Sequence, residues 1–192
     1  VSFLWFFFLK SSLSISWTCL GGIGKDCRLD MDLQISFGMP VEKDAKDIWE
    51  LIKNTRNLDL NSAYSYLILC KYFSESCIIA KTGGKVIGFI SAFQTPNNPE
   101  FLFIWQVAVD SNYRRMGLAM NMFEHLLIRK KCQQIRYIEI TVNPSNAAAY
   151  SLYHRLANRL DTSCEASICF PSCLFPGAQH EDEIMLRIGP LR

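Results

Sequence analysis

The stretch that decides the fold reads VAVDSNYRRMGLA and spans residues 107–119. It ends a run over residues 101–109 whose only polar side chain is Gln106, which is typical of a buried strand. A short polar loop follows, and the pattern Arg-x-x-Gly-x-Ala then opens an amphipathic helix. A helix in this position offers unpaired backbone N–H groups and its positive dipole end to an anion, and Gly117 lets the backbone approach closely. The stretch therefore predicts a phosphate-binding site.

Two common phosphate-binding motifs do not fit the spacing of this stretch. No Lys-Ser or Lys-Thr follows Gly117, so it is not a Walker A loop, and no Gly-x-Gly precedes it as a dinucleotide fingerprint requires. The plain alternative is a strand–turn–helix unit with Arg114 and Arg115 as a basic surface pair. The order of strand, loop and helix favours the phosphate site.

The composition fits one folded domain. The chain has 192 residues, of which 49% are apolar and 20% charged, and its net charge is +2. This apolar content excludes a mostly disordered chain, and the balanced charge gives no reason to expect nucleic-acid binding.

Hydrophobic periodicity and turn residues predict the elements that follow Met31. We expect strands at residues 34–38, 76–80, 86–93, 101–109, 137–142 and 184–188. We expect helices from Pro40 and at residues 61–73, 118–131 and 146–160. Loops are expected at residues 94–100 and in the Cys- and Pro-containing region that ends at Gly177. The order of elements indicates an α/β (mixed α+β) domain with a central mixed, mostly antiparallel sheet flanked by helices.

The first 30 residues differ from the rest. Residues 1–9 are apolar except for one serine, and Lys10 is the only charged residue before Gly24. A signal peptide carries its positive charge before the apolar stretch, and a membrane-spanning helix needs about 20 mainly apolar residues. We therefore expect residues 1–30 to be an extension outside the fold, with a signal or anchor as the alternative, and residues 31–192 to form the domain.

The eight cysteines match no zinc template and include no Cys-x-x-Cys pair. Cys70 and Cys77 lie in apolar surroundings, where a free cysteine is usually a small buried side chain. Cys164, Cys169 and Cys173 cluster late in the chain, where a disulfide or a metal site is the alternative to reduced thiols. We expect no metal.

Two motifs together resemble the GCN5-related N-acetyltransferase superfamily. The strand at residues 105–109 with the loop that follows is similar to its acyl-CoA pyrophosphate loop. The segment Asn143-Pro144-Ser145-Asn146, followed by Tyr150 and Tyr153, resembles its strand–helix unit beside the pantetheine and thiol. The resemblance implies an N-acetyltransferase domain whose splayed strands hold the cofactor.

Several blocks resemble one family in that superfamily, the L-2,4-diaminobutyrate acetyltransferases of ectoine biosynthesis. These blocks are residues 58–64, 88–92, 105–110, 141–146 and 180–190. The resemblance implies that acetyl-CoA, as co-substrate, acetylates N4 of L-2,4-diaminobutyrate in a cytoplasmic homodimer with no membrane partner. The alternatives are an acetyltransferase of the same fold for another small amine, and an acyl-CoA-binding module without turnover.

The resemblance assigns cofactor roles residue by residue. It implies that the cofactor is bound by Val107, Val109, Arg114, Arg115, Met116, Gly117, Leu118, Ala119, Met120 and Asn146. Tyr153 is the candidate acid for the departing thiolate, and its alternative role is to cap the core. Asn146 has a helix N-cap as its alternative role, and both can hold.

The acceptor carries a carboxylate and two amines, so its pocket needs acids and hydrogen-bond donors together. The candidate substrate-binding residues are Asp59, Asn61, Tyr64, Trp105 and Asn143. The alternative for residues 59–62 is a helix cap, and for Trp105 it is core packing. Glu183 and Glu139 are candidate catalytic bases, and Glu181 is a further acid near the amine. A solvated charge run and a strand-face ion pair are the alternatives for these glutamates.

Overall fold

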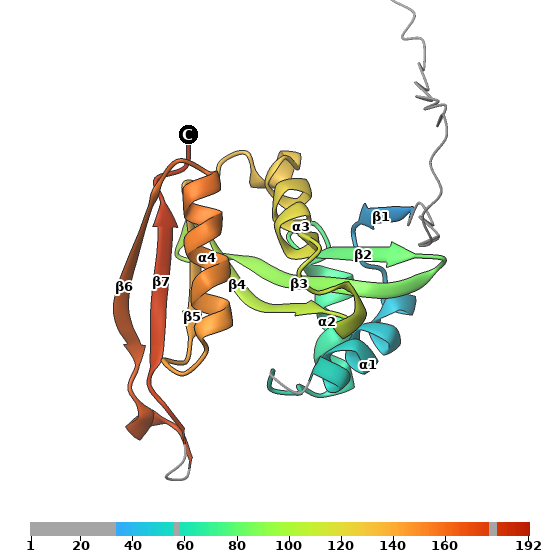
Figure 1. The fold of residues 1–192 in the computed structure, drawn as a ribbon, viewed down its shortest axis with the longest axis horizontal. Coiled ribbons are helices and arrows are strands. Elements are labelled where there is room, and N and C mark those ends of the chain that lie inside the picture. The colour runs from blue at the N-terminus through green and yellow to red at the C-terminus, as the bar shows by residue number, and fades with distance from the viewer. Residues whose placement is uncertain (1–33, 56–57, 177–179) are drawn as a thin grey trace, which may run out of the picture. The chain divides into compact units, whose positions relative to one another are not determined.

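A central sheet of seven strands forms the core of the computed structural model, which describes residues 34–55, 58–176 and 180–192 (Figure 1). The strand order is β1-β2-β3-β4-β5-β7-β6, and all neighbouring pairs are antiparallel except β4 and β5. The strands are β1 (Ile35–Gly38), β2 (Ile78–Thr82), β3 (Lys85–Thr95), β4 (Asn98–Val109), β5 (Tyr137–Val142), β6 (Ser163–Phe170) and β7 (Glu183–Gly189). The predicted mixed, mostly antiparallel sheet is confirmed. The expectation for residues 1–30 lies outside the described residues.

Helices cover the two faces of this sheet. They are α1 (Ala45–Thr55), α2 (Ala63–Tyr72), α3 (Leu118–Leu127) and α4 (Ala147–Arg159). One buried cluster joins α1 and α2 to Phe89 and Ala108, and a second joins α3 and α4 to strand residues such as Ile104. On α3, burial at helical spacing, as at Leu118, Met122 and Leu126, explains why the segment folds as an amphipathic helix.

Two regions predicted as loops contain paired strands. Residues 94–100 form a tight β3–β4 hairpin in which Thr95 pairs with Asn98. The two prolines are tolerated because Pro96 lies in the turn and Pro99 precedes Phe101, where pairing with β5 begins. β6 lies in the second region that was predicted as a loop. The sequence did not predict this strand because it is an edge strand with mostly exposed side chains and lacks a buried alternating face.

The β4 strand carries a bulge that decides what each of its faces presents. Ser91 pairs with Gln106 and Ala92 with Ile104, so Trp105 is the extra residue. Before it, Ile104 packs in the α3–α4 cluster, and after it Ala108 packs in the α1–α2 cluster. The prediction that residues 101–109 are buried on both faces is wrong at this position, because Trp105 is 43% exposed.

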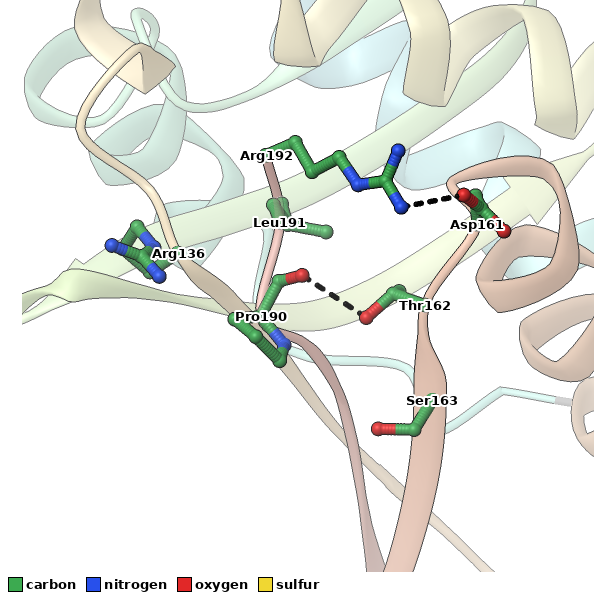
Figure 2. Close-up of a pocket in the computed structure, with 7 residues that line it drawn as sticks. All are labelled: Arg136, Asp161, Thr162, Ser163, Pro190, Leu191 and Arg192. Carbon is green, nitrogen blue, oxygen red and sulfur yellow. Dashed lines mark hydrogen bonds and ion pairs between the residues drawn. The ribbon is translucent and has the colours of Figure 1, made fainter.

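Residues that follow β7 contact the segments before β5 and β6 and line a pocket there (Figure 2). The Leu191 N–H donates to the Arg136 carbonyl at 2.7 Å, and the Thr162 hydroxyl donates to the Pro190 carbonyl at 3.1 Å. Arg192 forms an ion pair with Asp161 at 2.9 Å. These residues surround a cavity of about 510 Å³ whose lining contains none of the predicted site residues.

In the part of the chain that the structure describes, none of the helices has the length and apolar character needed to cross a membrane. The described cysteines Cys70, Cys77, Cys132, Cys164, Cys169 and Cys173 are free thiols, of which Cys70, Cys77 and Cys132 are buried. No three His, Cys, Asp or Glu side chains among the described residues stand close enough to hold a metal ion.

Candidate active site

A cavity of about 600 Å³ lies where β4 and β5 part. Their parallel pairing ends at Ile104 and Ile140, although β4 continues to Val109. Val107 and Val109 line the cavity, so this part of β4 turns an unpaired backbone edge toward it. A strand edge of this kind can pair with amide groups of a ligand.

The N-terminus of α3 forms a second wall. Gly117 has φ 78° and Arg115 has φ 64°, so both adopt the left-handed conformation in the tight turn before the helix. The first intrahelical bond runs from the Asn121 N–H to the Gly117 carbonyl at 3.0 Å, so the N–H groups of the first turn have no partner within the helix. Of the predicted cofactor residues in this turn, Met116 is outside the described lining, and the others line the cavity: Arg114, Arg115, Gly117, Leu118, Ala119 and Met120.

The cavity wall is rich in arginine. Arg114, Arg115, Arg155 and Arg159 all line it. Arg114 also donates to the carbonyls of Val109 at 3.2 Å and Thr55 at 3.5 Å, which braces the end of α1 against β4. Four guanidinium groups beside a helix N-terminus fit a ligand with several phosphates, such as coenzyme A.

The sequence prediction missed Arg155 and Arg159. Their signal is the spacing on α4, since they follow Leu152, which also lines the cavity, by three and seven residues and so share its face of the helix. Arg159 also pairs with Glu124 of α3, so α4 is tied to α3 beside the cavity.

Two of the predicted residues, Tyr153 of α4 and its N-cap Asn146, line the cavity. Tyr153 is 5% exposed, lines the cavity, and packs edge-on against Phe123 with ring centroids 6.3 Å apart. Burial raises the pKa of its phenol well above the ordinary value, so the phenol keeps its proton at neutral pH. The Asn146 side chain accepts from the Ala149 N–H at 3.1 Å as the α4 N-cap, and Asn146 also lines the cavity.

The predicted acceptor residues are divided by the structure. Trp105 lines the cavity together with Leu58, Gln106 and Thr141. The described lining does not include Asp59, Asn61, Tyr64 or Asn143. Asp59 is exposed in the loop before α2, and Tyr64, the second residue of α2, is 69% exposed. Ser62, not Asp59 or Asn61, is the α2 N-cap, and its hydroxyl accepts from the Ser65 N–H at 3.3 Å.

The three glutamates lie outside the described lining as well. Glu139 on β5 is held by Arg187 of β7, and Glu183 is half-buried at the start of β7. Burial and the charges of Glu139 and Glu183 raise the pKa of the Cys169 thiol. Glu181 accepts from the Ser145 N–H at 3.1 Å, which ties the β6–β7 connection to the turn before α4.

Comparisons with known proteins agree with this geometry. The model of the acetyltransferase (GNAT) family matches residues 43–157. The L-2,4-diaminobutyric acid acetyltransferase of Virgibacillus pantothenticus is 49% identical over 80% of this chain and 97% of its own length. The enzyme of the same name from Halalkalibacterium halodurans is 43% identical over 84% of this chain and 85% of its own length.

Solved structures give the same result. The chain is similar to diaminobutyrate acetyltransferase EctA from Paenibacillus lautus in complex with its substrate L-2,4-diaminobutyric acid and coenzyme A. The TM-score is 0.80 and the identity 43%, over 82% of this chain and 96% of that one. Ard1 from Thermoplasma volcanium, at 19% identity and a TM-score of 0.67, covers 82% of this chain and 99% of its own, and shares the fold. The chain therefore belongs to the acetyltransferase (GNAT) family and, within it, to the group of L-2,4-diaminobutyric acid acetyltransferases.

Proposed function

We propose that the protein transfers the acetyl group of acetyl-CoA to the side-chain amine of L-2,4-diaminobutyrate and yields N4-acetyl-L-2,4-diaminobutyrate, a precursor of ectoine. The observation that carries this function is one cavity that joins the phosphate-binding terminus of α3 to Tyr153 and Trp105. The Virgibacillus and Halalkalibacterium relatives, and the Paenibacillus lautus enzyme in complex with its substrate and coenzyme A, support this choice of acceptor and donor.

The donor half of the cavity uses backbone groups and arginines. Acetyl-CoA supplies the acetyl group as a thioester. The N–H groups around Gly117 and the guanidinium of Arg115 hold its pyrophosphate. The open edge of β4 at Val107 and Val109 binds the pantetheine amides, and an N–H of this edge stabilises negative charge on the thioester oxygen.

Tyr153 serves as the acid. Its phenol remains protonated at neutral pH because burial raises its pKa, and it lines the cavity beside Asn146. The phenol donates its proton to the sulfur as the carbon–sulfur bond breaks. Asn146 holds the start of α4 in place through its N-cap bond, so the phenol stays aligned.

The acceptor half must bind two amines and one carboxylate and accept one proton. Trp105 forms the wall of this half. The sequence assigns the charged groups of the amino acid to Asp59, Asn61, Tyr64 and Asn143, which lie outside the described lining of the cavity. Glu183, with Glu139 as the second candidate, removes the proton from the attacking amine directly or through water. We also propose a homodimer in the cytoplasm, where both substrates occur, and light scattering of the purified protein tests the dimer.

Thiol release from acetyl-CoA by the full chain tests the function. The assay offers L-2,4-diaminobutyrate, ornithine, lysine and a polyamine separately, and mass spectrometry of the product identifies the acetylated nitrogen. Selective turnover of diaminobutyrate at N4 is the expected result. Turnover of another amine alone contradicts the acceptor assignment, and binding of acetyl-CoA without turnover of any amine indicates a binding module.

A further inference from the structure

We propose that Gln106 is a positioning residue that fastens the acceptor loop, residues 58–62, to the thioester-binding strand and thereby sets the selectivity for the length of the amine substrate. The inference rests on the proposed function of the site. It concerns the one polar side chain in residues 101–109, for which neither the phosphate motif nor the catalytic roles give a reason.

Gln106 uses both ends of its side-chain amide. It is 6% exposed, and its Nε2 donates to the backbone carbonyl of Asp59 at 2.7 Å. Its Oε1 accepts from the phenol of Tyr66 on α2, at 3.1 Å, and Tyr66 is fully buried. The Gln106 backbone N–H donates to the Ser91 hydroxyl at 3.0 Å. Four segments, namely β3, β4, α2 and the loop before α2, therefore meet at this residue.

The position of Gln106 at the bulge gives these bonds a role in the site. Trp105 lines the cavity, and the next side chain, Gln106, holds the loop that carries Leu58 and Asp59. The bulge therefore links the position of the acceptor loop to the β4 edge at Val107, which binds the thioester under the proposed function. A buried amide is costly to leave unpaired, so the network favours one arrangement of this loop.

Loss of the anchor should affect the two substrates differently. The hydrogen bonds of the Gln106 side chain go to Asp59 and Tyr66, and neither the turn at Gly117 nor the β4 edge at Val107 depends on them. The distance from the loop to the thioester limits how long an amine the site accepts. A loosened loop should therefore weaken diaminobutyrate binding and admit ornithine, which is one methylene longer, while acetyl-CoA binding stays the same.

The test compares Gln106→Met and Tyr66→Phe with wild type in the full chain. Gln106→Met keeps the length of the side chain and removes both hydrogen bonds, and Tyr66→Phe removes one. We expect KM for diaminobutyrate to rise about tenfold in Gln106→Met and about threefold in Tyr66→Phe, as for loss of two net hydrogen bonds and of one. We expect KM for acetyl-CoA to stay within about twofold, and the preference for diaminobutyrate over ornithine to fall by about the same factor as the affinity.

Ser76→Ala is the matched control. Its hydroxyl is also buried and donates to the Ala92 carbonyl at 2.7 Å, but it does not bond to the acceptor loop. We expect it to lower the unfolding midpoint and to leave both KM values and the preference unchanged.

Several results overturn the proposal. Unchanged KM and preference in folded Gln106→Met or Tyr66→Phe overturn it, and so does an equal rise of both KM values, which marks a general structural defect.

The activity of wild type separates this inference from the proposed function. If wild type releases no thiol from acetyl-CoA with diaminobutyrate, the proposed function fails and the inference fails with it. If wild type is active and the variants match it, the inference fails alone.

Discussion

Glu139 of β5 accepts two hydrogen bonds from the guanidinium of Arg187 across the β5–β7 ladder, at 2.9 Å and 2.7 Å. The guanidinium carbon also lies 5.3 Å from the centre of the Phe101 ring. Glu139 thus forms the strand-face ion pair that the sequence analysis gave as its alternative role. Among the described residues, Glu183 takes part in none of the ion pairs.

This difference predicts unequal effects of two conservative substitutions. Glu183→Gln should lower kcat for diaminobutyrate at least about 100-fold, the usual cost of losing a general base. Glu139→Gln should change kcat only a few-fold and lower the free energy of unfolding by less than about 1 kcal/mol, since its partner Arg187 is half-exposed. Steady-state kinetics and urea unfolding of both variants measure these effects. A large loss in Glu139→Gln with a small one in Glu183→Gln would reverse the assignment.

Removal of the Tyr153 hydroxyl should slow the reaction without weakening donor binding. Tyr153→Phe keeps the buried ring against Phe123 and removes the proton donor. We expect kcat to fall roughly 100-fold and KM for acetyl-CoA to stay within about twofold. Because burial raises the phenol pKa well above its ordinary value, wild type should show no alkaline loss of rate from this group below about pH 10. A variant that keeps full kcat would exclude Tyr153 as the acid.

The fold was predictable wherever burial imposes a period. β5 occupies the predicted residues 137–142 because alternate side chains are buried there, and α4 follows its Asn146 cap. β6 left no such pattern, since an edge strand with exposed Ile168 and Phe170 has no buried face that would impose an alternation. The region after Asp161 therefore resembled a loop in composition.

The site was predictable where local chemistry determines it, and less so where long-range contacts do. The turn at Arg115 to Gly117 lies within one short segment, so its motif predicts the phosphate wall. The exposure of Trp105 depends on a bulge relative to β3, and an apolar run carries no signal for that register shift. The ion pair of Glu139 depends on the pairing of β5 with β7, which the spacing of the two strands in sequence does not specify.

Because Gly117 adopts a left-handed conformation, we expect one added methyl group, as in Gly117→Ala, to weaken acetyl-CoA binding. A Cβ at Gly117 would meet no atom within 4 Å, so Gly117→Ala acts only through the backbone strain at φ 78°. We expect a loss of about 1 kcal/mol in the free energy of unfolding and a several-fold rise in KM for acetyl-CoA, since the N–H groups shift from the phosphates. KM for diaminobutyrate should not change.

Gly84→Ala is the matched control for that substitution. Gly84 has φ 81° and equally open surroundings, and it lies in the β2–β3 turn. It should cost a similar amount of stability and leave both KM values unchanged. If the two variants raise KM for acetyl-CoA equally, the turn at Gly117 has no special role in donor binding.

Two buried thiols should make the domain less stable at alkaline pH. Burial raises the pKa of Cys70 to about 11 and that of Cys77 to about 12, from the ordinary 9.0. Above pH 9 the unfolded chain loses these protons while the folded chain keeps them, so the stability that is fully present below pH 9 decreases until the pH passes the folded values.

Urea unfolding at pH 8 and pH 10.5 measures this loss against a Cys70→Ala/Cys77→Ala variant. The cavities left by the two substitutions lower the stability of the variant at both pH values, so only the change between them is informative. We expect wild type to lose roughly 1–2 kcal/mol per thiol more than the variant over this interval, because each pKa unit is worth about 1.4 kcal/mol. Parallel losses in the two proteins would show that the thiols lose their protons equally in the folded and unfolded chains, and that other groups cause the alkaline instability.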